Sequence, residues 1–131
     1  MCIFCKIVSG EIPCSKVYED EKILAFLDIK PLNPGHTLVI VKNHYANIEE
    51  TPEEEFLALA SAAKKIGRLL KDKLGIEGYN LSMNNDPVAG QDIAHIHFHL
   101  IPRRSGDGLA PWSRPEYDAG GNKKVLAKLL S

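Results

Sequence analysis

Three histidines alternate with large apolar residues near the end of the sequence, at His95, His97 and His99. Because strand side chains point alternately to two faces, this spacing predicts a strand over residues 95–102 with one face of imidazoles and one apolar face. Residues two apart on a strand lie roughly 6.5–7 Å from each other, so His97 should have an imidazole on either side. The row holds three of the five histidines in the chain, and we interpret it as a chemical site rather than as packing.

Other segments predict the partners of this strand. Thr51, Pro52 and Glu54 indicate a helix start with a capping box, and apolar residues then recur at three- and four-residue steps until Gly75. Short runs rich in β-branched and aromatic residues favour strands over residues 16–19, 22–28, 36–42 and 78–84. We therefore expect an α+β fold, a five-stranded antiparallel sheet with one long helix packed on it.

Length and charge bound the class of protein. A chain of 131 residues suffices for one core, so we expect a single domain over residues 1–131, whose tail at residues 110–131 carries a short helix. The 16 basic and 17 acidic residues nearly balance, which argues against a general attraction to nucleic acid or to a membrane surface. No apolar run approaches the roughly 20 residues that span a bilayer, and the first residues lack the apolar region of a signal peptide. We expect a cytoplasmic protein that holds its ligands locally.

Two uses compete for a row of histidines, metal coordination and nucleophilic catalysis. Both prefer a neutral imidazole that is oriented by a hydrogen bond through its other nitrogen. Cys2 and Cys5 have the two-residue spacing that lets two thiolates hold one metal ion, and His44 and His95 could complete a tetrahedral site. Taken by themselves, the residues leave both uses open.

The segment from His95 to Pro102, preceded by Gln91, resembles the signature of the histidine triad (HIT) family, in which histidines alternate with hydrophobic residues. Asp28-Ile29, the run from Pro34 to Ile40, and Asn84 are similar to further landmarks of that family in order and spacing. The resemblance covers nearly the whole chain. It implies a HIT-like fold of the Hint-like nucleotide phosphoramidase branch, with the sheet extended across a homodimer.

The resemblance also implies catalytic roles. His97 would be the nucleophile that forms a nucleotidyl-histidine intermediate, and His99 would contact the phosphate or the leaving group. The loop from Asn84 to Asp92 would close over the phosphate, with Gln91 and Asp92 at its end. Asp92 stands where animal members have Ser or Thr, and a carboxylate there would disfavour an anionic leaving group.

The remaining matches concern the nucleotide and a metal. Asp28 would hold the ribose hydroxyls, His36 would either support the phosphate pocket or satisfy a turn, and Trp112 in the tail would reach toward the pocket of a partner chain. The purine would lie among Ile3, Phe4, Ile7, Phe26 and Ile29. In a zinc-bearing microbial branch of the family, the matching residues hold one structural zinc ion per chain, and no catalytic metal is required: Cys2, Cys5, His44 and His95.

The function implied is hydrolysis of purine nucleoside phosphoramidates or adenylyl conjugates at the α-phosphorus, with release of a nucleoside monophosphate. Two alternatives stay open: hydrolysis of dinucleoside polyphosphates by the same chemistry, and a zinc-stabilised nucleotide-binding module with little turnover. The intact His97 favours an enzyme, because a pure binder has no need of a nucleophile between two imidazoles.

Overall fold

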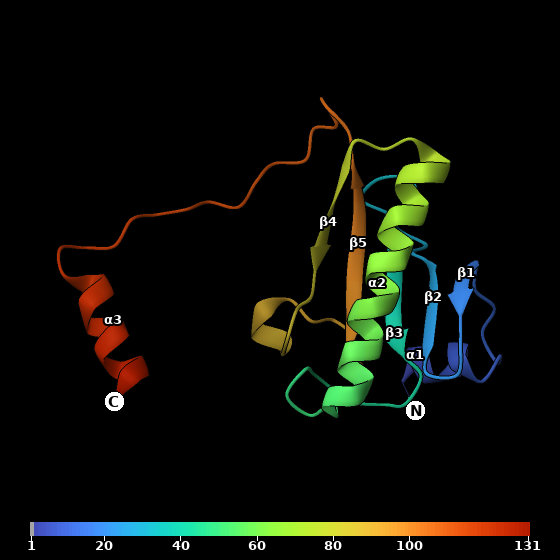
Figure 1. Cartoon of the computed structure of the whole chain (residues 1–131), viewed down its shortest axis with the longest axis horizontal. Coiled ribbons are helices and arrows are strands. Elements are labelled where there is room, and N and C mark those ends of the chain that lie inside the picture. Colours follow the sequence, from blue (N-terminus) through green and yellow to red (C-terminus); the bar gives the residue numbers. More distant parts are fainter. Residues whose placement is uncertain (1) are drawn as a thin grey trace.

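The computed structural model describes residues 2–131 and is built on one five-stranded sheet in the order β1-β2-β3-β5-β4 (Figure 1). Every neighbouring pair of strands is antiparallel, which confirms the predicted α+β fold. The strands are β1 (Lys16–Glu19), β2 (Ile23–Leu27), β3 (Thr37–Val41), β4 (Gly78–Ser82) and β5 (His97–Arg103). The helices are α1 (Ile3–Val8), α2 (Glu53–Leu74) and α3 (Gly121–Leu130), and a 3-10 turn, η1, covers Pro87–Ala89.

The long helix α2 lies across one face of the sheet (Figure 1). Its apolar side buries Leu59, Ile66 and Leu70 against residues of the central strands, as the helical spacing predicts. Gly67 lets the helix approach β4 closely, because a Cβ there would lie 2.4 Å from ring atoms of Tyr79. The helix ends as expected at Gly75, which adopts the left-handed conformation with φ of 63°.

The predicted capping box at the start of α2 is wrong. Pro52 occupies the N-cap position and has no side-chain cap, while the Thr51 hydroxyl donates to the carbonyl of Asn47 in the preceding turn. Glutamates at the first three helical positions place negative charge beside the positive end of the helix dipole.

The strand with the histidines begins two residues later than predicted. His95 lies in a bend before β5, and the next amide, that of Ile96, donates to the Tyr45 carbonyl instead of joining the ladder of β3. His97 and His99 pair with Ile40 and Leu38 of β3. Their side chains therefore share the face of the sheet opposite α2, while Phe98 and Leu100 face the helix.

The short helix α1 covers that second face and was not predicted. Six residues are too few for a periodic pattern, and the helix begins at a cysteine, with the Cys2 sulfur accepting the amide of Cys5. Phe4 of α1 is buried in a second apolar cluster with Leu24, Phe26, Leu38 and Ile40. In this way α1 closes over the same strands that carry His97 and His99.

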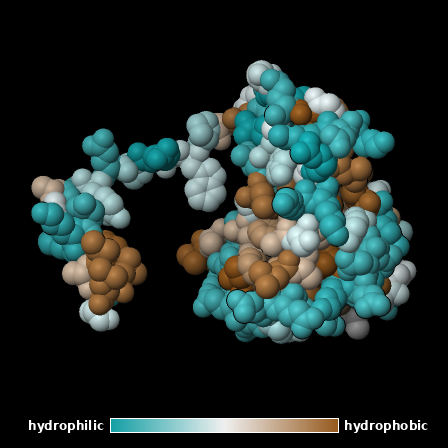
Figure 2. All heavy atoms as spheres, in the orientation of Figure 1, coloured by the Kyte–Doolittle hydropathy of each residue, from teal (hydrophilic) through white to brown (hydrophobic). Residues whose placement is uncertain are grey.

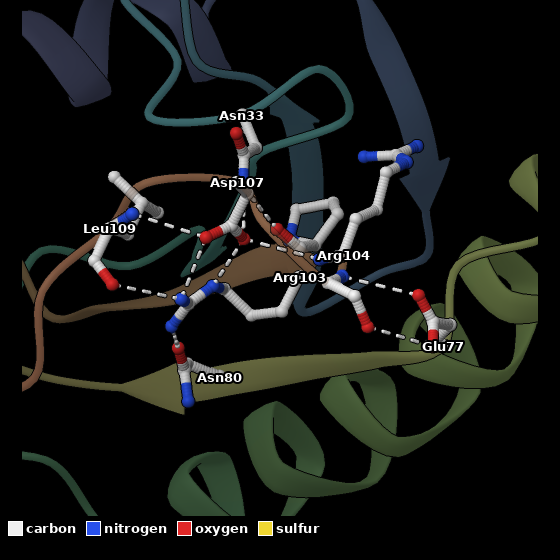
Figure 3. A network of polar contacts seen from close by, with 9 residues as sticks. Asn33, Glu77, Asn80, Arg103, Arg104, Asp107 and Leu109 are labelled. Carbon is white, nitrogen blue, oxygen red and sulfur yellow. Dashed lines mark hydrogen bonds and ion pairs between the residues drawn. The ribbon is translucent and has the colours of Figure 1, made fainter.

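The chain leaves the sheet through a network centred on Asp107 (Figure 3). Its carboxylate accepts from the Arg103 guanidinium at 2.7 and 3.0 Å and from the Asn33 amide at 3.0 Å, and this network holds the pKa of Asp107 well below its usual range.

Beyond this network, residues 110–131 form an extended arm that ends in α3, apart from the rest of the molecule (Figure 1, Figure 2). Within residues 2–131, no helix combines the length and apolar character needed to cross a membrane.

Candidate active site

His97 lies at the start of β5 with only 3% of its surface exposed. Its Nδ1 is 2.7 Å from the carbonyl oxygen of His95. A carbonyl can only accept, so in its neutral form the ring carries its proton on Nδ1 and presents the lone pair of Nε2. Phe4 packs edge-on against the ring, with centroids 5.0 Å apart, and limits its rotation. The structure therefore holds an imidazole with a free lone pair at a fixed position, as a nucleophile requires.

A chain of hydrogen bonds fixes the opposite tautomer in His99. The Leu32 amide donates to Nδ1 of His36, so His36 carries its proton on Nε2 and donates it to Nδ1 of His99 at 2.9 Å. His99 is then left with an Nε2–H and no partner for it among residues 2–131. Burial, with the neighbouring His97 and His36, lowers the pKa of His99 to about 4, so the ring is a neutral donor near pH 7.

His97 and His99 line a pocket of about 290 Å³, near the lower end of the range of about 300–1,000 Å³ for small-molecule sites. Its polar lining is Asp28, Asp92, His97 and His99, and the rest of the lining is apolar. The pocket brings together most of the residues predicted for the nucleotide: Ile3, Phe4, Ile7, Phe26, Asp28, Ile29, Asp92, His97 and His99. The polar side chains of the pocket suit a phosphate group, and its aromatic and aliphatic side chains suit a nucleotide base.

Gln91 and Asn84 do not line this pocket. The Gln91 side chain accepts from the Asp86 amide at 2.8 Å and donates to the Ala46 carbonyl at 2.6 Å, so its oxygen and one of its two N–H groups are used within the protein. Asn84 donates to the Gly90 carbonyl. Both residues brace the loop that carries Asp92, and the hydrogen bonds to the phosphate expected from Gln91 stay a prediction. The loop needs bracing, since Asp86 holds a positive φ of 75°.

Cys2, Cys5, His44 and His95 meet beside the pocket, and their ligand atoms all lie within 4.8 Å of one another. Four sulfur–nitrogen distances are 3.4–3.7 Å and the Nδ1 atoms of the two histidines are 3.3 Å apart. A tetrahedral zinc with these ligands would separate them by about 3.3–3.8 Å, and only the two sulfurs, at 3.2 Å, are closer. Because His95 donates its Nε2–H to the Val41 carbonyl, its Nδ1 lone pair faces the sulfurs. The donor set fits a closed metal site.

A second group, Asp28, His36 and His99, also has its ligand atoms within 4.8 Å. It does not fit a metal. Nδ1 of His36 accepts the Leu32 amide, so the Nε2 that faces His99 carries a proton and offers no lone pair. We read these residues as a hydrogen-bonded support for the pocket.

The sequence interpretation missed part of the pocket lining: Ile12, Pro13, Cys14, Leu27, Leu38 and Ile93. Leu38 could have been found, because it pairs with Phe26 on one side and His99 on the other. Nothing in the local sequence indicates that the turn at Pro13 and Cys14 folds back beside Phe26. Trp112, predicted to reach a partner's pocket, stands 86% exposed in the arm and does not line the pocket of its own chain.

Comparison with known protein families identifies the family of this chain. The family model described as "HIT domain" matches residues 9–106. The chain belongs to the HIT family. This confirms the resemblance carried by His95, His97 and His99, and the match covers the whole sheet and α2.

Several HIT proteins are close in sequence. The chain is 56% identical to an uncharacterised HIT-like protein of Methanocaldococcus jannaschii over 82% of this chain and 83% of that protein. It is 45% identical to the adenylylsulfatase HINT3 of Arabidopsis thaliana over 82% of this chain, which spans 55% of that protein. It is 40% identical to the adenosine 5'-monophosphoramidase HNT1 of Saccharomyces cerevisiae over 98% and 82% of the two chains. These names confirm the Hint-like branch and a HIT hydrolase.

Solved HIT structures share the fold. A HIT protein from Bacillus subtilis superposes with a TM-score of 0.89 at 40% identity, over 98% of this chain and 94% of that one. A Zn-bound histidine triad protein from Mycobacterium smegmatis superposes with a TM-score of 0.80 at 40% identity, with the same coverage of the two chains.

Proposed function

We propose that this HIT hydrolase cleaves purine nucleoside phosphoramidates or related adenylyl conjugates at the α-phosphorus and releases a nucleoside monophosphate. The observation that carries the proposal is the tautomer of His97, whose Nε2 lone pair opens into a pocket of nucleotide size. A nucleotide-binding module with little turnover would not need the Nε2 lone pair of His97 in the pocket.

The reaction takes two displacements at phosphorus. Nε2 of His97 attacks, the Nε2–P bond forms, and the bond from phosphorus to the leaving group breaks with its electron pair on the leaving atom. The Nε2–H of His99 hydrogen-bonds to a phosphoryl oxygen or to the departing atom, and the departing atom takes its proton from solvent water. A water molecule then attacks the same phosphorus and releases its proton to solvent as the new P–O bond forms, while the Nε2–P bond breaks with its electron pair on His97.

Apolar residues and one carboxylate would hold the nucleoside. Phe4 and Phe26 lie edge-on with ring centroids 5.6 Å apart, and their faces with Ile3 and Ile7 form a wall for a purine. Asp28 already accepts the Lys30 amide through Oδ1 at 2.9 Å. Its Oδ2 is available to accept from the ribose hydroxyls.

Asp92 supports an amine as the leaving group. Its carboxylate lines the pocket beside His99, where it would repel a departing polyphosphate or sulfate and attract a departing amine that gains a proton. Steady-state kinetics with adenosine phosphoramidate, adenylyl sulfate and diadenosine tetraphosphate test this. We expect the highest kcat/KM for the phosphoramidate. Asp92→Asn should reduce the ratio of this kcat/KM to the values for the two substrates with anionic leaving groups. A preference for diadenosine tetraphosphate would replace this proposal with the second candidate.

We infer that the metal site at Cys2, Cys5, His44 and His95 binds one structural zinc ion per chain. The donor set supports this, as does the Zn-bound relative. Zinc would fix the sulfurs and both imidazoles at the edge of the sheet and leave no position for substrate. No step of the reaction uses it.

We also infer a homodimer. Strand β4 is one of the two edge strands of the sheet; one side of its backbone pairs with no strand in residues 2–131, and Leu81 is 47% exposed. Pairing of β4 with its copy across a two-fold axis would continue the sheet and cover this edge. Sedimentation equilibrium should give twice the mass of one chain; a single-chain mass at micromolar concentration would exclude the homodimer.

A further inference from the structure

The loop that joins β2 to β3 begins at Asp28 and ends at His36, and both residues serve the site. Asp28 lines the pocket, and His36 donates to Nδ1 of His99. The two ends are joined, because the Asp28 amide donates to the His36 carbonyl at 2.9 Å. The middle of the loop has little apolar cover, with Ile29 93% and Leu32 56% exposed. It therefore needs polar contacts to hold one conformation.

A tight turn connects Asn33, in the middle of this loop, to His36. The His36 amide donates to the Asn33 carbonyl at 3.0 Å, and Gly35 between them has a φ of 96°. Pro34 followed by a glycine with left-handed φ is typical of a type II turn. The amide of the preceding residue, Leu32, donates to Nδ1 of His36 at 3.1 Å. The position of Asn33 therefore decides where the His36 ring and its donor lie.

The side-chain amide of Asn33 fastens this turn to the end of the sheet where the arm begins (Figure 1). Its Nδ2 donates to the Pro102 carbonyl at 2.9 Å and to Oδ2 of Asp107 at 3.0 Å. Both partners can only accept, which fixes the nitrogen of the amide toward them. Between the two ends of the loop only Lys30 and Asn33 have polar side chains. Of these two, Asn33 is the one that hydrogen-bonds to another segment of residues 2–131.

Asp107 is a fixed acceptor for this amide. Its side chain is only 10% exposed. Besides Asn33, its carboxylate accepts from the Arg103 guanidinium and from the backbone amides of Arg104 and Leu109, each at 3.1 Å. Figure 3 shows the Asn33 amide and the Arg103 guanidinium meeting at this carboxylate. Burial and these donors leave the carboxylate one position, so the turn is held by a group that does not move.

We propose that Asn33 and Asp107 are positioning residues of the reaction, which keep His99 in the tautomer that donates from Nε2. Neither residue lines the nucleotide pocket. They act through the turn, because the turn places His36 and His36 selects the tautomer of His99. The proposal rests on the proposed function for the role of the Nε2–H and deepens it, since it extends the machinery to the network around Asp107.

A displaced turn would reverse the tautomers. Without the Leu32 amide as donor, the His36 ring would carry its proton on Nδ1 and turn the lone pair of Nε2 toward His99. His99 would then donate from Nδ1 to His36. Its Nε2 would present a lone pair to the phosphate instead of a proton, which removes the donor from the reaction.

Nitrogen NMR of the ligand-free, ¹⁵N-labelled protein tests the tautomer without a substrate. At neutral pH, long-range proton–nitrogen spectra of wild type should show His99 protonated on Nε2, with its signals assigned by their loss in His99→Gln. Asn33→Ala should give a mixture of both tautomers, and Asn33→Asp, which has the same shape and no donor, should do the same. Asn80→Ala is the matched control, because Asn80 on β4 accepts from Arg103 of the same network at 2.8 Å and does not touch the loop. It should keep the wild-type tautomer.

Kinetics separate positioning from general stability. Asn33→Ala should lower kcat for adenosine phosphoramidate about tenfold, because a misplaced donor acts on the chemical step. Its dissociation constant for adenosine monophosphate should stay within about threefold of wild type, and both constants should stay within about twofold in Asn80→Ala.

Three results would overturn the proposal: a wild type with His99 protonated on Nδ1, an Asn33→Ala variant with the wild-type tautomer or with wild-type kcat, or equal losses in Asn33→Ala and Asn80→Ala. The first of these needs no variant to fold. A wild type that does not hydrolyse adenosine phosphoramidate overturns the proposed function instead, and the spectra then decide by themselves whether Asn33 sets the tautomer of His99.

Discussion

At the scale of single residues, the site depends on which nitrogen of each imidazole carries the proton. The His95 carbonyl accepts from His97 and so selects the tautomer with the proton on Nδ1. His36, held by the Leu32 amide, donates to Nδ1 of His99 and so selects the tautomer with the proton on Nε2. Two rings with centroids 4.9 Å apart are thereby given opposite tasks, one to attack and one to donate. A row of histidines in the sequence does not reveal this division, because it is decided by backbone groups of other segments.

The depressed pKa of His99 makes stability depend on pH. The ring faces His97, His36, Asp28 and Asp92, and burial keeps it neutral in the folded protein down to about pH 4. The unfolded chain takes up this proton near pH 6.5, so the free energy of unfolding falls as the pH drops from about 6.5 toward 4.

Denaturant unfolding of wild type and His99→Gln at pH 7.5 and pH 5 measures this effect. Between these pH values the wild type should lose about 1 kcal/mol more than the variant, a figure reduced for the partial exposure of the ring. The other acid-sensitive groups are present in both proteins and cancel. Equal losses would mean that His99 titrates normally.

Asp28 should contribute through the ribose. Asp28→Ala should weaken binding of adenosine monophosphate about tenfold to a hundredfold, because a carboxylate that accepts from two hydroxyls is lost. Calorimetry with 2',3'-dideoxyadenosine monophosphate is the control, and the variant should bind that ligand almost as well as wild type does. An equal loss for inorganic phosphate would show that Asp28 acts on something other than the diol.

At the scale of elements, the strands and the long helix were predictable, whereas the capping of α2 and the helix α1 were not. Alternation and β-branched runs locate β1 to β5 to within two residues, because each strand must bury one face. Thr51 and Glu54 look like a capping box, but the Thr51 hydroxyl is used by the Asn47 carbonyl. The helix α1 depends on Cys2 and on contacts with distant strands, which no local pattern records.

In the loop from Asn84 to Asp92, the sequence motif marks an important residue but does not reveal its contacts. The family signature indicates that Gln91 matters, and the structure shows that it fastens Asp86 to Ala46. Gln91→Leu should lower the free energy of unfolding by about 1 kcal/mol, since the partly buried Asp86 amide and Ala46 carbonyl lose their partner. Val88→Ala in the same loop, at a side chain 99% exposed, should have almost no effect in the same denaturant titration. If Gln91→Leu abolished activity at unchanged stability, the Gln91 side chain would act directly on the phosphate of the substrate.

At the scale of the whole molecule, the proposed zinc ties α1 and its pocket residues to the sheet. Metal analysis should find about one zinc per chain, and Cys5→Ala should lower the melting temperature more than it lowers kcat, because the site is not part of the reaction. Cys14→Ala, a cysteine outside the metal site, should keep the zinc. A metal-free wild type of unchanged thermal stability would exclude this role.

The whole molecule also gathers separate segments around the His97 ring and its pocket. The bend before β5 orients the ring, α1 limits its rotation, and Asp28 after β2 and Asp92 in the loop after β4 line the pocket into which this ring opens. The central claim is that this ring becomes covalently bound to the nucleotide. His97→Ala should therefore lose turnover and retain binding of adenosine monophosphate, whereas His99→Gln should slow turnover by roughly 10²- to 10⁴-fold.

The most direct measurement is rapid quenching of the enzyme with a labelled adenylyl substrate, followed by intact mass and peptide mapping. The account predicts an adduct of one nucleoside monophosphate per chain on wild type, attached to His97 and absent from His97→Ala. An adduct on another residue, or hydrolysis by His97→Ala at near the wild-type rate, would contradict it.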